Sequence, residues 1–213
     1  MRREVRPARE PRAPLFFFSY AHNDGRARNG PNSAVGRFFQ DLSENVAEMA
    51  GSPAGADPGF MDRSMPGGTR WTPELLHAVG TCQVFIALLS APYLESDWCA
   101  MEWDAFSRRA VLASEAGPTH ETCIIPVLWA PVRDWQFPPV VRKVQRFSPE
   151  GLRDADIVQY RRNGIFGLLQ LGRKTPYRTV VFQLAYRVAE VYYTHQVEPR
   201  VFGQRQLRNV FEG

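Results

Sequence analysis

One acidic side chain lies in a setting that could do chemistry. Glu102 follows Trp98 by four residues, in a stretch whose pattern predicts a helix capped by Ser96 and running to about Ala113. The positions three and four residues from it hold no cation; they are Trp98, Cys99, Ala105 and Phe106. A carboxylate among aromatic side chains at the mouth of a sheet is a candidate for function, because such settings perturb pKa values. The alternatives are a surface carboxylate at the edge of an apolar stripe, or one paired with a distant arginine.

The elements that must position this side chain follow from the hydrophobic pattern. Short apolar runs typical of buried strands cover residues 15–19, 59–62, 84–89 and 123–129. Helical periodicity is present from Ser33 to Met49, in a short stretch begun by Thr72 and Pro73, and from Tyr177 to Tyr192. Apolar strands separated by amphipathic helices predict an α/β fold, with a parallel sheet covered by helices on both faces.

Ligands of such sheets bind outside the carboxyl ends of the strands. In this chain those ends are Ser19-Tyr20, Asp62, Ser90 and Trp129. Any active site is therefore expected at the edge of the sheet that these residues define.

The rest of the chain gives weaker signals. From Ala130 to Pro176 we predict irregular structure, with one strand near 144–147 and a short helix near Gly164. The domain organisation that we expect is a disordered Arg-rich tail over 1–13, a single domain over 14–195, and a flexible C-terminal tail over 196–213.

Composition excludes several classes of protein. The 213 residues are 44% hydrophobic and 23% charged, as in an ordinary globular domain, and no apolar run approaches the length of a membrane span. The net charge is +4, and the first 14 residues supply most of it, so the body of the chain makes a poor case for nucleic-acid binding. The three cysteines Cys82, Cys99 and Cys123 are widely spaced, which favours reduced thiols in the cytoplasm and no metal site.

Several short motifs together resemble a known family. Phe-Phe-Ser-Tyr over 17–20 is similar to the opening box of Toll/interleukin-1 receptor (TIR) domains, and 59–62 with the Gly-rich loop after it resembles their second strand. The stretch 84–90, followed by Tyr93, Ser96, Trp98-Cys99 and Glu102, resembles their third strand and the next helix. The fuller string, which includes Asp62-Arg63, Gly68, Trp71 and Glu102-Trp103-x-x-Phe106, is similar to bacterial TIR-like proteins of FxSxx-COOH peptide clusters.

The chain also departs from that family. The Phe-Trp pair near the last helix is missing, since Phe182 has no Trp beside it. Ala21 and His22 follow the first strand, where many catalytic members carry a basic residue. The second departure favours docking over catalysis.

The resemblance implies a flavodoxin-like sheet of about five strands and an NAD+ hydrolase that cleaves the nicotinamide–ribose bond. It assigns Glu102 as the catalytic carboxylate. The substrate-binding residues that it implies are Ser19, Tyr20, His22, Asp62, Arg63, Trp71 and Trp98. NAD+ is then a substrate, and no cofactor or metal is expected.

The alternative that the resemblance leaves open is a non-catalytic signalling or scaffold module. Such a module acts by docking to other TIR domains or to a partner, and the resemblance to peptide-cluster proteins suggests a place in peptide maturation. In either case the expected partners are NAD+, a second copy or other TIR domains, with no nucleic acid and no membrane span.

Overall fold

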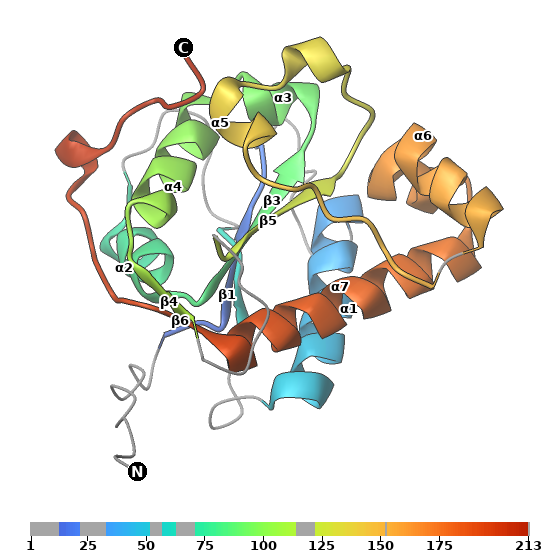
Figure 1. Cartoon of the computed structure of the whole chain (residues 1–213), viewed down its shortest axis with the longest axis horizontal. Coiled ribbons are helices and arrows are strands. Elements are labelled where there is room, and N and C mark those ends of the chain that lie inside the picture. Colours follow the sequence, from blue (N-terminus) through green and yellow to red (C-terminus); the bar gives the residue numbers. More distant parts are fainter. Residues whose placement is uncertain are drawn as a thin grey trace.

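A parallel sheet of four strands lies at the centre of the structure, a computed structural model that describes residues 13–21, 33–51, 57–62, 71–113, 122–151 and 153–212. The strand order is β2-β1-β3-β5 (Figure 1), where β1 is Phe16–Ser19, β2 is Gly59–Phe60, β3 is Val84–Leu89 and β5 is Ile124–Leu128. A separate antiparallel pair joins β4 (Val111–Ala113) to β6 (His195–Val197). The predicted fold class is confirmed, with four strands in the main sheet of the described residues where about five were expected.

Helices cover both faces of this sheet. On one face α1 (Ala34–Ala50) packs along α7 (Lys174–Thr194), and α6 (Asp154–Gln170) lies beside α7 (Figure 1). On the other face α2 (Pro73–Thr81) contacts α4 (Asp97–Ser107). The remaining elements are short; they are α3 (Ala91–Leu94), η2 (Asp134–Gln136), α5 (Pro139–Arg142) and η3 (Gln204–Gln206).

The alternation of side chains along β1 sets the position of the site. Phe16 and Phe18 point toward α1, where both rings contact Phe39 at centroid distances of 5.9 and 5.4 Å. Phe17 points to the opposite face and stacks on Phe85 at 5.6 Å. Because successive side chains alternate, Ser19 shares the face of Phe17, which is the face that α4 covers. A polar group at the end of β1 is thereby directed at α4.

The predicted caps start the helices on that face. The Thr72 side chain accepts a hydrogen bond from the backbone N–H of Leu75, and the Ser96 side chain accepts one from Cys99. These bonds satisfy amide groups that the first turn of a helix leaves without partners. The helix α4 begins where predicted but ends at Ser107 rather than near Ala113, because residues 111–113 leave it to pair with β6.

The segment from 130 to 176 is more helical than its sequence predicts. No strand forms at 144–147 in the described structure, where the Phe147 N–H donates to the Pro126 carbonyl. The helix expected near Gly164 is the 17-residue α6, which breaks at Gly164 with φ near +63°. A Cβ at this position would lie 2.4 Å from the carbonyl oxygen of Trp129. Close approach and backbone conformation both require glycine here, and the break disturbs the helical period.

The C-terminal segment, residues 198–212, is ordered where we expected a flexible tail over 196–213. It runs past α2 and α4 (Figure 1) and buries Phe202, Leu207 and Phe211. The backbone N–H of Arg208 donates to Asp104 on α4 at 3.1 Å. The buried side chains are spaced by five and four residues, with only the three-residue η3 between the first two, so no periodic pattern in the sequence predicts their burial.

Residues 1–12 of the expected Arg-rich tail lie outside the described residues. Among the described helices, none has the length and apolar character needed to cross a lipid bilayer.

Candidate functional site

Glu102 lies in the interior of the molecule on α4, with 4% of its surface exposed. The hydroxyl of Ser19 donates to Glu102 Oε2 at 2.5 Å. Ser19 Oγ also lies 3.1 Å from the hydroxyl of Tyr93 on α3, and both of these residues are buried. The carboxylate is neither open to solvent nor paired with an arginine of the described chain.

The surroundings of Glu102 change its ionisation. Burial raises its pKa from the ordinary value of 4.5 to about 8, and the hydrogen bond from Ser19 opposes this rise. The nearby charge of Asp62 raises the pKa further, and the indole of Trp98 lowers it. Since the pKa lies above 7, most molecules hold Glu102 protonated at neutral pH while the site is empty.

Two more of the predicted site residues, Tyr20 and Asp62, contact each other at the carboxyl edge of the sheet. The hydroxyl of Tyr20, directly after β1, donates to the backbone carbonyl of Asp62 at 2.6 Å. Both residues are buried, and Asp62 follows β2 by two positions. This bond ties together the carboxyl ends of β1 and β2, the edge at which the site was expected.

Two tryptophans also belong to the site: Trp71 lies just before α2, and Trp98 lies on α4. The rings of Trp71 and Trp98 lie 4.9 Å apart at an angle of 38°. Each indole N–H is buried, and neither meets a hydrogen-bond acceptor in the described part of the chain. Trp98 is near enough to affect the pKa of Glu102, although its N–H does not have the geometry of a hydrogen bond to the carboxylate. Buried donors without acceptors are uncommon, and a bound ligand is one way to satisfy them.

The structure thus brings five of the predicted substrate-binding residues around Glu102. Ser19 contacts the carboxylate directly, Asp62 and Trp98 influence its pKa, and Trp71 and Tyr20 contact these two. His22 and Arg63 lie outside the described residues.

The other two strand ends do not join the site. Ser90 caps α3 through a hydrogen bond from the backbone N–H of Tyr93. Trp129 packs between Phe38 of α1 and Phe166 of α6, on the opposite face of the sheet.

Sequence reasoning did not assign a role to two residues beside the site. Tyr93 belongs to the motif that carried the resemblance, yet its residue type alone predicts no contact with Ser19. Phe211 packs on Tyr93 and Trp103, with centroids 5.8 and 5.9 Å apart. No signal in the sequence could have found this contact, since more than a hundred residues separate Phe211 from its partners.

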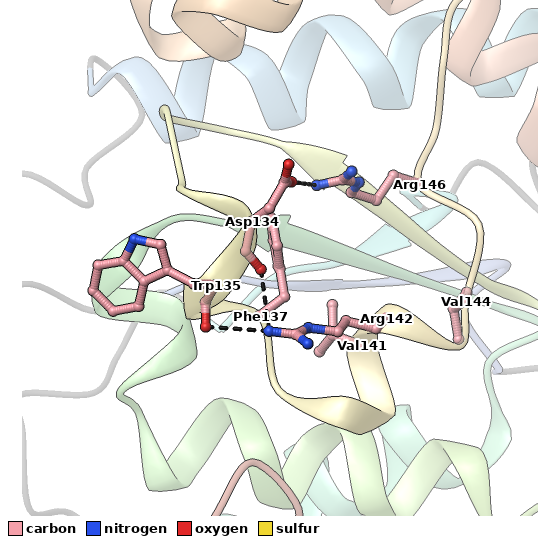
Figure 2. A pocket seen from close by; sticks show the side chains of 7 residues that line it. All are labelled: Asp134, Trp135, Phe137, Val141, Arg142, Val144 and Arg146. Atoms are coloured by element: carbon pink, nitrogen blue, oxygen red, sulfur yellow. Dashed lines mark hydrogen bonds and ion pairs between the residues drawn. The ribbon is translucent and has the colours of Figure 1, made fainter.

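A cavity of about 490 Å³ lies on the segment after β5, between η2 and α5 (Figure 2). Figure 2 shows the Arg142 guanidinium donating to the carbonyl groups of Asp134 and Trp135, and Arg146 paired with the Asp134 carboxylate. The cations of this cavity already have acceptors within the chain. Glu102 does not line it, so the cavity is separate from the site described above.

No group of three potential metal ligands occurs within the described ranges. The three cysteines are free, in agreement with the sequence prediction of reduced thiols, and all three are buried. At the site itself, one buried carboxylate has a hydroxyl donor and an indole beside it.

The fold and the site define a flavodoxin-like α/β domain with a buried carboxylate at the carboxyl edge of its sheet. The sequence profile of the TIR domain matches residues 39–161, more than half of the chain. The protein therefore belongs to the TIR domain family. The matched range includes Asp62, Trp98 and Glu102, whereas Ser19 precedes it. A search of curated proteins finds no match.

Proposed function

We propose that this TIR domain is an NAD+ hydrolase that cleaves the bond between nicotinamide and ribose, with Glu102 as the catalytic carboxylate. The observation that supports this most is the environment of Glu102. It is buried, it accepts a hydrogen bond from Ser19, and no described cation neutralises it. A buried carboxylate without a cation beside it is costly to ionise, and a cationic ligand can supply the missing charge.

One carboxylate suffices for this reaction. A glycosidase ordinarily needs an acid to protonate the leaving oxygen and a second carboxylate on the sugar side. The nicotinamide of NAD+ is already cationic and leaves as a neutral molecule, so no general acid is required. The ribose develops positive charge in the transition state, and a preorganised anion stabilises that charge most strongly where water is excluded.

The ionisation of Glu102 fits this role once substrate binds. A cation placed beside the carboxylate favours its charged form and lowers its pKa from the raised value of the empty site. We assign Glu102 to the ribose hydroxyls and to the developing positive charge. The indole N–H groups of Trp98 and Trp71 are donors for the oxygen atoms of the bound dinucleotide.

The test is NAD+ turnover by the purified protein, followed as nicotinamide release at low and high protein concentration. Glu102→Gln keeps the shape of the side chain and removes its charge, and we expect a loss of about 100-fold or more. The matched control is Glu95→Gln, because Glu95 is an exposed carboxylate seven residues away on the chain. Turnover that survives Glu102→Gln, or a wild-type protein that never consumes NAD+, would refute the assignment.

A second candidate function is docking to another protein, and one observation favours it. Helix α7 exposes Phe182, Tyr186 and Tyr193, which fall on one helical face and are each about half exposed. TIR domains commonly associate with other TIR domains, so a second copy is the natural partner for this face. Equilibrium sedimentation of the wild type beside Phe182→Ser/Tyr186→Ser tests it, and a wild type that stays monomeric at high concentration would refute self-association.

Docking and catalysis are compatible if assembly completes the site. A steep dependence of turnover on protein concentration, lost in the α7 double variant, would link the two. A role in the maturation of a bacterial FxSxx-COOH peptide, and a cytoplasmic location, remain predictions from the sequence.

A further inference from the structure

A chain of hydrogen bonds leads away from Glu102 to Tyr93, a residue to which the family resemblance assigns no role. Ser19 Oγ lies between Glu102 Oε2 at 2.5 Å and the Tyr93 hydroxyl at 3.1 Å. The Ser19 hydroxyl has a single hydrogen, which it donates to Glu102. Tyr93 must then be the donor in its bond with Ser19, because the hydrogen of Ser19 is already in use.

The strength of this chain depends on the charge of Glu102. With Glu102 ionised, Tyr93 donates to Ser19 and Ser19 donates to Glu102, so both hydroxyl hydrogens have acceptors. With Glu102 protonated, its other oxygen can still accept from Ser19, but a hydrogen bond to the neutral acid is weaker than one to the carboxylate. Burial keeps the pKa of Tyr93 well above its ordinary value, so its hydrogen is present at any working pH. The arrangement therefore favours the ionised carboxylate.

The Tyr93 ring is held by the C-terminal segment. Phe211 contacts the rings of both Tyr93 and Trp103, at centroid distances of 5.8 and 5.9 Å. Neighbouring bonds fix Phe211 in place, since Asn209 donates to Asp97 at 2.6 Å and Arg208 to Asp104 at 3.1 Å. The segment thus joins α3 and α4, the two helices that carry Tyr93 and Glu102.

We propose that Tyr93 is a positioning residue for Glu102, that its hydroxyl directs the Ser19 hydrogen toward the carboxylate, and that Phe211 holds the Tyr93 ring in the orientation this requires. The proposal deepens the proposed function, because it explains how the carboxylate of a hydrolase is kept ready to ionise. It concerns the ionisation of Glu102 itself, which can be measured without substrate.

The other groups around Glu102 bear on any pH measurement. Asp62 faces it from beyond β2, and Cys99 lies on its own helix α4. Burial raises the pKa of Cys99 well above its ordinary value, so this thiol stays neutral between pH 5 and 9. A reference variant, Glu102→Gln, subtracts the contribution of all groups other than Glu102.

The experiment measures the free energy of unfolding between pH 5 and 9 for the wild type, Tyr93→Phe, Ser19→Ala and the double variant of these two, each with and without Glu102→Gln. The pH at which the Glu102 contribution disappears reports its folded-state pKa. We expect Tyr93→Phe to raise that pKa by about half a unit to one unit, the effect of one lost neutral hydrogen bond. In the Ser19→Ala background Tyr93→Phe should add nothing, because Tyr93 acts through Ser19.

Phe211 is tested against a matched control from the same segment. Phe202 is also buried, but it packs on the guanidinium groups of Arg108 and Arg200 rather than on Tyr93. Phe211→Leu should raise the pKa of Glu102, whereas Phe202→Leu should lower stability without moving that pKa. Should Tyr93→Phe fail to fold, this pair of variants decides the question.

Equal pKa shifts in the two phenylalanine variants, or no shift in a folded Tyr93→Phe, would overturn the proposal. Nicotinamide release is measured on the same proteins. Absence of turnover in the wild type argues against the proposed hydrolase and leaves the pKa result standing, so the two failures are distinguishable.

Discussion

Ser19 at the end of β1 donates to Glu102 on α4 at 2.5 Å, across 83 positions of the chain. The bond joins the first strand of the sheet to α4, the second helix after β3. It exists because the alternation along β1 turns Ser19 toward the face that α4 covers, the same face that Phe17 shares with Phe85. The packing of α4 on the sheet thereby buries one carboxylate beside a hydroxyl donor.

This burial should make the protein less stable as the pH rises. The unfolded chain releases the Glu102 proton near pH 4.5, whereas the folded chain keeps it until about pH 8. Between these values the folded state binds more protons, so the contribution of Glu102 to stability is full below pH 4.5 and is lost as the pH rises through 8. Glu102→Gln removes this dependence and should gain a few kcal/mol relative to the wild type above pH 8. Urea unfolding at several pH values measures it, and parallel curves for the two proteins would contradict it.

The same carboxylate should control the pH dependence of the proposed reaction. If Glu102 must be ionised, kcat/KM for NAD+ rises with pH and levels off near the pKa of the free site, about 8. Below that value the rate should fall about tenfold per pH unit, because only the ionised fraction reacts. Initial rates of nicotinamide release from pH 6 to 9 measure this. A rate that falls as pH rises over this range would instead indicate that the protonated carboxyl acts.

The sequence predicted those parts of the fold that local patterns encode. The helix caps Thr72 and Ser96 and the strand 84–89 agree with the structure because side-chain chemistry and apolar periodicity act over a few residues. The packed C-terminal segment could not be predicted, since Phe211 is buried only by contacts with Tyr93 and Trp103 far away in the chain. The candidate site shows the same division. Local chemistry made Glu102 a candidate and the family resemblance assigned it, whereas its bond with Ser19 depends on tertiary structure.

Glycine at position 164 should be essential for stability. Gly164→Ala places a Cβ 2.4 Å from the Trp129 carbonyl oxygen at a positive φ, so strain and a backbone clash add. We expect a loss of at least about 2 kcal/mol. The matched control is Gly172→Ala, which has nearly the same φ but no atom within 4 Å of the added Cβ, and should cost about 1 kcal/mol. Equal losses in urea unfolding would show that the close approach to Trp129 does not matter.

The three cysteines should be inert to thiol reagents in the folded protein. All are buried, and burial raises the pKa of Cys82 to about 11 and that of Cys123 to about 12. The thiolate is the reactive form, so both low access and low ionisation suppress reaction. Titration with a chromogenic disulfide at pH 8 should find no fast-reacting thiol in the native state and three after denaturation. A thiol that reacts within seconds in the folded protein would contradict the burial of its side chain.

Arg109 should fasten the C-terminal segment to the rest of the domain. Its buried guanidinium donates to the carbonyl groups of Val79 on α2, of Val197 at the end of β6 and of Glu198 at the start of the segment. Arg109→Met keeps much of the volume but removes the hydrogen bonds to these carbonyl groups, of which that of Val197 keeps the Gln83 amide as a donor, and we expect a loss of about 2 kcal/mol. The control is Arg205→Met, an exposed arginine of the same segment, which should change stability by less than about 0.5 kcal/mol. Hydrogen exchange should report faster opening of residues 198–212 in Arg109→Met alone. Unchanged exchange there would mean that Phe202, Leu207 and Phe211 suffice to hold the segment, because their buried surface then outweighs the lost hydrogen bonds.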